Sequence, residues 1–314
     1  MPLLRSAAPA PPPANRSPAH PGRFALAALL LGAAAIGFAP IFVRLSELGP
    51  TATGFWRLAF ALPALWLWHV CERTQVPAQP ARRRRELSGF AVAGLFFAAD
   101  LAVWHWSLHL TSVANATLLP NFAPVFVTLA GYLLFGERFS ALFIAGMAIA
   151  VTGVMILMGE SLELGSRHLL GDTLALSTAV FYAGYIVAVG RLRGRHSTAQ
   201  IMAWSGLVTA AALLPVALLS GESLIAHTAR GWLVLAALGL FSHALGQSLI
   251  AYALAHLPAA FSSVGLLLQP ALAALLAWLL LAEPIGPWQA AGAAVILAGI
   301  VLARRGSRGQ ISSG

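Results

Sequence analysis

A single carboxylate interrupts one of the long apolar runs of this 314-residue chain. Asp100 lies within FAVAGLFFAADLAVWHWSLHL, residues 90–110, where it is the only acidic side chain. An ionisable group at the depth of a hydrocarbon core is costly, and such groups typically bind ions, protons or substrates. We therefore expect Asp100 to face the interior of a helix bundle as a substrate or proton site. A buried structural carboxylate is the alternative.

The expected partner of Asp100 is Arg57, which lies in the preceding apolar run. At about 1.5 Å per helical residue, Asp100 would lie roughly 15 Å and Arg57 roughly 10 Å below the same membrane surface. An ion pair between them would keep Asp100 charged, whereas an unpaired Asp100 could take up a proton. Snorkelling of the long Arg57 side chain to the interface is the alternative for that residue.

Other polar and aromatic side chains are expected to complete a site for a cation or zwitterion. Trp104 shares a helical face with Asp100 at spacing i, i+4, and His243 and Gln247 share a face in the same way. Prolines next to some of these residues would bend helices and expose backbone acceptors. The expected substrate-binding residues are Asp100, Trp104, Tyr182, Tyr185, His243, Gln247, Gln269 and Asn121. Helix packing and proline kinks are the structural alternatives.

The sequence does not indicate enzymatic chemistry. It contains no Lys, hence no phosphate-binding P-loop, and it lacks HExxH, GxSxG and Cys-His metal motifs. The single cysteine, Cys71, cannot form an intramolecular disulfide. We expect no catalytic residues, no metal and no cofactor, and no enzyme. A membrane enzyme acting on a lipid-linked substrate, with Asp100 and His105 as acid and base, is the alternative.

Membrane helices must position these residues, because 59% of the chain is apolar and only 9% is charged. Soluble domains carry about 25% charged residues. Since a crossing takes about 20 helical residues, we expect an all-α membrane protein with ten transmembrane helices. The expected ranges are 24–45, 50–70, 88–110, 114–135, 138–158, 170–190, 198–219, 231–255, 260–281 and 286–303.

The second half of the chain repeats the first at a spacing of 146 residues. The matched pairs are Pro124 with Pro270, Glu137 with Glu283, Gly146 with Gly292 and Gly153 with Gly299. An odd number of helices in each half makes the two copies inverted five-helix repeats, an arrangement typical of secondary transporters. We expect the two glutamates to cap the helices that follow them and the glycines to form helix-packing faces.

The arginines predict the topology. Most of them, including Arg82 to Arg85, fall on the cytoplasmic side if both termini are cytoplasmic. The net charge of +9 therefore indicates membrane orientation, not nucleic-acid binding. We expect a disordered tail at 1–23, repeats at 24–158 and 172–304, a periplasmic connection at 159–171 and a cytoplasmic tail at 305–314.

Two segments carry a family resemblance: PNFAPVFVTLAGYLLFGERFSALFIAGMAIAVTGVMIL, residues 120–157, and LLLQPALAALLAWLLLAEPIGPWQAAGAAVILAGIVL, residues 266–302. In each, a Pro-containing helix is followed by an acidic residue and a Gly-spaced helix. Residues 24–304 resemble the EamA-type bacterial branch of the drug/metabolite transporter superfamily. The resemblance implies movement of small metabolites, such as amino acids, through a cavity lined mainly by helices 1, 3, 4, 6, 8 and 9.

These observations together predict a secondary transporter of the bacterial inner membrane that exports small metabolites. Its expected partners are a small-molecule substrate and the lipid bilayer, and the expected state is a monomer or homodimer. Proton coupling through Asp100 and an uncoupled facilitator both remain open.

Overall fold

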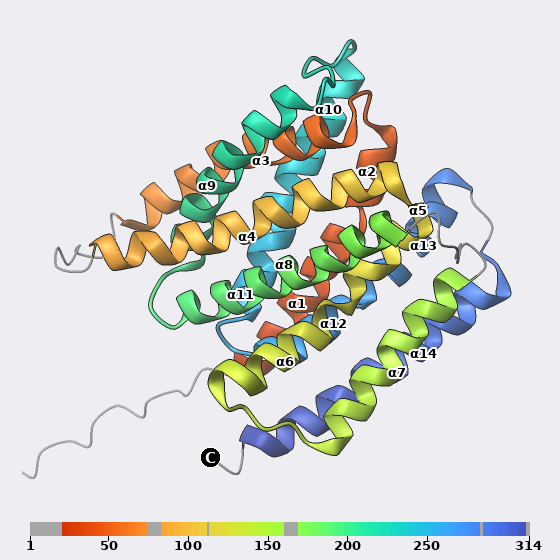
Figure 1. Cartoon of the computed structure of the whole chain (residues 1–314). Helices are drawn as coiled ribbons and strands as arrows, with labels where there is room; N and C mark the ends of the chain where they lie inside the picture. The colour runs from red at the N-terminus through yellow and green to blue at the C-terminus, as the bar shows by residue number, and fades with distance from the viewer. Residues whose placement is uncertain (1–20, 74–82, 112, 160–168, 283–284, 312–314) are drawn as a thin grey trace, which may run out of the picture.

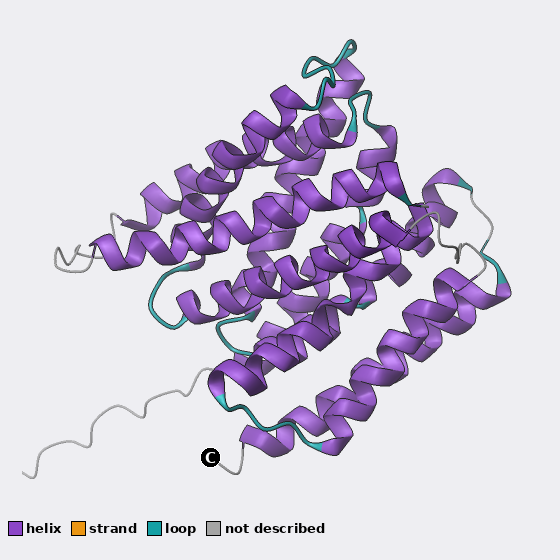
Figure 2. Cartoon of the chain, viewed as in Figure 1, coloured by secondary structure: helices purple, strands orange, loops and turns teal. Residues whose placement is uncertain are grey.

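The computed structural model describes residues 21–73, 83–111, 113–159, 169–282 and 285–311. Within these ranges every regular element is a helix (Figure 2). Most of the expected tail (1–20), Arg82, the middle of the connection (160–168) and Glu283 lie outside the described residues. The last helix continues through Ile311, beyond residue 305 where the second tail was expected.

The elements follow the expected ranges, and several are divided (Figure 1). The first half contains α1 (Pro21–Gly37), α2 (Ala39–Leu45), α3 (Pro50–Arg73), α4 (Arg83–Leu110), α5 (Val113–Leu118), the 3-10 turn η2 (Leu119–Phe122), α6 (Ala123–Phe135) and α7 (Ala141–Met158). The second half contains α8 (Leu169–Arg193), α9 (Thr198–Leu219), α10 (Ala229–Ala237), the π-helix η5 (Leu238–Gln247), α11 (Ser248–Ala253), α12 (Ala259–Leu266), α13 (Leu268–Leu281) and α14 (Pro287–Ile311).

Nine helical stretches among the described residues, of 18 to 25 residues each, are long and apolar enough to cross a membrane. The 24-residue α3, which contains Arg57, is not one of the nine. It nevertheless packs against α9 (Figure 1) and against η5. The expected count of ten crossings therefore stays a prediction.

Three prolines lie at breaks between helices, and the sequence predicted a bend at two of them, Pro120 and Pro270. Pro40 follows the break between α1 and α2, Pro120 lies in the turn η2, and Pro270 lies just after the junction of α12 and α13 at Leu267. Because a proline lacks an N–H and clashes with the preceding turn, the helical hydrogen bonds cannot continue unchanged across it. Corresponding helices of the two halves, residues 113–135 and 259–281, are thus both discontinuous.

The two halves are interleaved. In the first half, α4 packs against α8 and α9, and α1 packs against η5, α11 and α13. The main buried core accordingly joins residues of both halves, such as Leu29 and Phe97 with Ile186 and Phe261. A site at the centre of this bundle therefore takes its walls from both repeats.

Glycines bring α7 and α14 into backbone contact, side by side along one flank of the bundle (Figure 1). A Cβ at Gly153 would lie 2.6 Å from the Ile296 nitrogen, and one at Gly292 would collide with the Leu157 nitrogen. Gly146 and Gly299 pack in the same way against Ala303 and Ala150. These glycines form a helix-packing seam of small residues, as the sequence predicted.

Glu137 does not cap α7, contrary to the prediction. Ser140 is the N-cap, and its hydroxyl accepts a hydrogen bond from the Phe143 nitrogen at 3.1 Å. Gly136, at φ 67°, ends α6 in the left-handed conformation, and the Glu137 nitrogen donates to the Gly131 carbonyl. A serine directly before the helix reaches the first-turn N–H groups, which a glutamate four residues before α7 does not.

Candidate functional site

Six of the nine residues expected at the site or as its ion pair meet where α3, α4, α8 and η5 adjoin. We call this set the central cluster; it consists of Arg57, Asp100, Tyr182, Tyr185, His243 and Gln247. Phe97 lies among them, with its ring centroid 4.8 Å from that of Tyr185 and 5.5 Å from that of His243. The Arg57 guanidinium carbon lies 6.0 Å from the Phe97 ring centroid.

Asp100 and Arg57 are close enough to interact electrostatically. Within the described part of the chain, no direct ion pair joins them. The charges are therefore neighbours in an apolar bundle without neutralising each other by contact. Each remains able to receive an ion of opposite charge.

The Gln247 amide lies next to the hydroxyls of Tyr182 and Tyr185, whose rings stack at 6.0 Å. The walls of the central cluster are thus partly aromatic and partly polar. This combination suits a small solute that carries charge at one end.

Several buried polar atoms of the central cluster have no hydrogen-bond partner among the residues that the structure describes. They are the Arg57 Nε, both ring nitrogens of His243 and the Gln247 Nε2. His243 and Gln247 are each only 1% exposed. Leaving one such group unsatisfied costs about 1–3 kcal/mol, so their concentration at one place indicates a site that a polar solute would complete.

Close helix contacts hold η5 in position. Gly239 allows the backbone of α3 to approach, since a Cβ at this position would lie 2.9 Å from the Arg57 carbonyl oxygen. Gly246 does the same for α1, since a Cβ there would lie 3.3 Å from the Gly32 carbonyl oxygen. The Ser242 hydroxyl donates to the Ala35 carbonyl at 2.9 Å. The π-helix is therefore fixed against the first half, with His243 and Gln247 turned into the central cluster.

Similar contacts place α4 against α9 and α8. The Thr209 hydroxyl donates to the Gly94 carbonyl at 2.9 Å, and Gly184 of α8 packs on the Phe96 ring. Phe97 and Asp100 are thus carried on a helix that is tied to two helices of the second half.

The other three expected residues have different surroundings. The Trp104 indole donates to the Ala116 carbonyl at 3.0 Å and links α4 to α5. The Asn121 amide donates to the Thr117 carbonyl at 2.7 Å within the broken segment between α5 and α6. Gln269 lies where α13 meets α1 at Gly37, and within the described ranges its Nε2 has no hydrogen-bond partner. The side chain of His105 lies outside what the structure describes.

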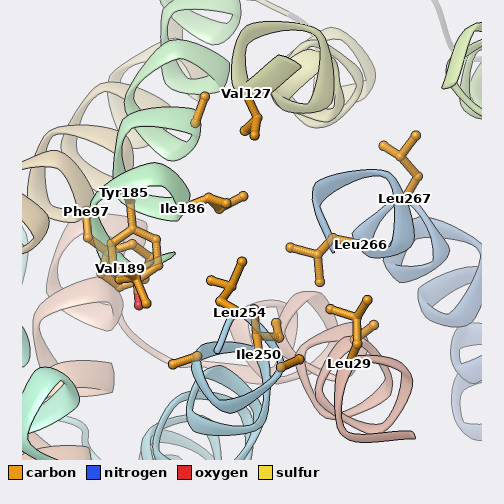
Figure 3. Close-up of a cluster of buried hydrophobic side chains, with 14 of the residues drawn as sticks. Leu29, Phe97, Val127, Tyr185, Ile186, Val189, Ile250, Leu254, Leu266 and Leu267 are labelled. Atoms are coloured by element: carbon orange, nitrogen blue, oxygen red, sulfur yellow. The ribbon is translucent and has the colours of Figure 1, made fainter. Parts of the chain in front are cut away.

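A cavity of about 210 Å³, which we call the mouth pocket, was not predicted from the sequence. Its lining comes from α6 and the loop after it, from α8, from α12 and from the segment after α11; the residues are Val127, Gly131, Phe135, Glu137, Val187, Gly190, Arg191, Leu254, Leu257, Ala259 and Ala260. Figure 3 shows Val127, Ile186, Leu254 and Leu266 pointing toward a common central space, with Tyr185 and Phe97 at its flank. The mouth pocket and the central cluster share α8, which carries Val187 and Arg191 of the pocket and Tyr182 and Tyr185 of the cluster.

Asp172, also missed from the sequence, joins α8 to the start of α5. One of its carboxylate oxygens accepts hydrogen bonds from the Thr111 hydroxyl at 2.5 Å and the Asn115 amide at 2.9 Å. The only sequence signal for Asp172 is its place in the first turn of α8, where a carboxylate is stabilised by the helix dipole.

Comparison with known proteins gives consistent results. The EamA-like transporter family matches residues 23–159 and again 169–305. A probable terminal-alkyne amino-acid exporter of Streptantibioticus cattleyicolor is 29% identical over 73% of this chain and 76% of its own length. A pseudopaline exporter of Pseudomonas aeruginosa is 27% identical over 71% of this chain and 78% of its own.

Two further similarities extend over nearly the full length. An uncharacterized transporter of Archaeoglobus fulgidus is 27% identical over 90% of this chain and 97% of its own length. One solved crystal structure matches with a TM-score of 0.76 over 91% of this chain and 97% of that chain, at 20% sequence identity. That similarity supports the fold.

Proposed function

The chain belongs to the EamA-like transporter family, and from this premise we propose that it exports small zwitterionic metabolites of the amino-acid class. It is a multi-pass membrane protein. Two relatives whose names include a cargo are named as exporters. The proposal places this export across a bacterial inner membrane with both termini in the cytoplasm, since arginines dominate that side.

The central cluster is the observation that carries the proposal. Arg57 and Asp100 present opposite charges that are close but not in direct contact. The carboxylate of an amino acid would bind Arg57, and its ammonium group would bind Asp100, through charge-assisted hydrogen bonds. The unsatisfied donors and acceptors of His243 and Gln247 would complete the recognition of these polar groups.

The position of the central cluster suits alternating access. Arg57 and Asp100 belong to the first repeat, and the tyrosines, His243 and Gln247 belong to the second. A rocking motion of one repeat against the other would change the spacing between these groups and open the site to one side and then the other. Asp100 is also the residue that would carry a proton if export is coupled to one.

A thermal-shift experiment tests binding at the central cluster. We expect purified protein to be stabilised by L-leucine but not by 3-methylbutylamine, which lacks the carboxylate, or by 4-methylpentanoate, which lacks the ammonium group. Arg57→Gln should abolish the shift, and Arg230→Gln, at an exposed arginine of α10, should retain it.

Two results would refute this proposal. One is equal stabilisation by the amine or the acid alone, which would mean that the two charges are not read together. The other is the absence of stabilisation by every member of a panel of L-amino acids in wild-type protein.

A further inference from the structure

We propose that the mouth pocket is a second solute-binding site, in which Glu137 and Arg191 hold the charged head group of a zwitterion before it reaches the central cluster. The inference rests on the proposed export of such solutes. It assigns a role to two charged residues outside the central cluster.

The position of Glu137 has no structural explanation. Its carboxylate oxygen lies over Gly131, where a Cβ would be only 2.8 Å away, in the last turns of α6. A negative charge at a helix C-terminus is opposed by the helix dipole. Among the described residues, no hydrogen bond or ion pair to this carboxylate compensates for that repulsion, and the capping role at α7 belongs to Ser140. Glu137 instead lines the mouth pocket.

Arg191 supplies the opposite charge. Its guanidinium carbon lies 3.3 Å from the centroid of the Phe135 ring, as in a cation–π contact. Because the N–H groups of a guanidinium lie in its plane, stacking on a ring leaves its edge able to bind a carboxylate. Phe135 thus holds Arg191 in place at the mouth pocket without neutralising it.

The remaining walls suit the apolar part of a small solute. Val127, Val187, Leu254 and Leu257 are aliphatic, and glycines and alanines complete the lining. The volume of about 210 Å³ lies below the roughly 300–1,000 Å³ of typical ligand pockets, so the solute must be small. Charged groups at the exposed end and buried apolar walls behind them would orient a zwitterion with its head group outward.

The test measures protection of a cysteine within the mouth pocket. In a Cys71→Ser background, Ala259→Cys provides the reporter, and the protein is placed in phosphatidylglycerol nanodiscs so that no zwitterionic lipid competes. We expect saturating L-leucine to slow maleimide labelling severalfold, and 3-methylbutylamine and 4-methylpentanoate to have little effect. Glu137→Gln and Arg191→Gln should each raise the half-protective leucine concentration about tenfold, as expected for loss of one charged hydrogen bond.

Matched variants separate the two sites. The Arg195→Gln variant changes an exposed arginine outside the mouth pocket. Leucine should protect its reporter cysteine as strongly as in the parent protein. Asp100→Asn should also retain protection, because it alters only the central cluster. Arg191→Lys should recover part of the lost affinity, since it restores the charge but not the planar geometry.

The outcomes distinguish this inference from the proposed function. If leucine gives an Arg57-dependent thermal shift but no protection at position 259, the mouth pocket is not a binding site and the export proposal stands. If protection depends on Glu137 and Arg191 while no Arg57-dependent shift occurs, the mouth pocket is supported and the central cluster is refuted. Protection that is lost in Asp100→Asn but kept in both mouth-pocket variants overturns the inference. The inference is also overturned if labelling becomes slow when phosphatidylethanolamine replaces part of the phosphatidylglycerol and leucine does not change that rate. A lipid head group would then be the occupant of the mouth pocket.

Discussion

Asp100 and Arg57 lie inside an apolar bundle, each in the electrostatic field of the other. Removing one member of such a pair leaves an uncompensated buried charge, which is far more destabilising than removing both. The contribution of these two charges to stability therefore differs from their contribution to solute binding. These contributions can be measured separately.

Asp100→Asn is expected to weaken leucine binding by about tenfold or more, through loss of a charged hydrogen bond, and to lower the unfolding temperature. Because Asp100→Asn/Arg57→Gln removes both charges, the double variant should recover stability but not binding. Leucine titration and thermal unfolding of the wild-type protein, the two single variants and the double variant provide a double-mutant cycle. Normal binding by Asp100→Asn would show that this carboxylate does not contact the solute.

Glu47 links two loops at the opposite end of the bundle from the mouth pocket. It accepts hydrogen bonds from the Thr228 hydroxyl and from the backbone nitrogens of His227 and Thr228, at 2.8 and 3.1 Å for the latter two. The Thr228 hydroxyl, followed by these backbone groups and the nearby His227 side chain, lowers the pKa of Glu47 below its ordinary value of 4.5. The charged form of Glu47 therefore holds the segment after α2 against the start of α10.

This pKa shift gives a pH dependence with a definite sign. A carboxylate whose folded pKa is depressed stabilises the fold above its unfolded value, near 4.5, and that contribution is lost as pH falls through the folded pKa. Wild-type protein should be more stable than Glu47→Gln by a margin that does not shrink between pH 8 and 6 and that shrinks only at acidic pH. Thermal unfolding across pH checks this. A margin that disappears by pH 6 would contradict it.

At the scale of elements, the sequence predicted helix ranges well where length and hydrophobicity decide them. The range 198–219 is reproduced by α9, and the bends near Pro120 and Pro270 occur because proline cannot continue the hydrogen-bond ladder. The π-helix η5 carries no such signal, since it depends on how its glycines pack against α1 and α3. The predicted cap at Glu137 was wrong because Ser140 lies closer to the first turn of α7.

The seam between α7 and α14 should be the stretch most sensitive to small changes in volume. Gly153→Ala would place a Cβ against the Ile296 backbone, so we expect destabilisation of about 1–3 kcal/mol from overpacking. Gly159→Ala is the matched control, because its Cβ would meet nothing within 4 Å and alanine favours helix. Unfolding of the solubilised variants provides the measurement, and equal stability of the two would refute close packing at this seam.

At the scale of the molecule, interleaving of the halves explains which parts of the candidate site could be predicted from the sequence and which could not. An ionisable or hydrogen-bonding side chain in an apolar span is visible in the sequence, so Arg57, Asp100, His243 and Gln247 could be chosen before their contacts were known. The mouth pocket could not be chosen, because Val127, Val187 and Leu254 are ordinary apolar residues that become its walls only through packing of distant helices.

The predicted orientation can be read from Cys71, the only cysteine of the chain, which is exposed near the end of α3. The arginine distribution places this end in the cytoplasm. A membrane-impermeant maleimide should therefore label it in permeabilised but not in intact cells. Ile225→Cys in a Cys71→Ser background, in the exposed loop before α10, should be labelled in both. The reverse pattern would invert the topology.

Counterflow in proteoliposomes tests the central claim most directly. Vesicles loaded with unlabelled L-leucine and diluted into trace labelled leucine should accumulate the label transiently, and mass spectrometry should recover the solute chemically unchanged. Arg57→Gln and protein-free vesicles should accumulate none, and an imposed pH gradient should alter the rate only if a proton is coupled. Uptake by wild-type protein no greater than by protein-free vesicles, or recovery of a chemically altered solute, would contradict the account.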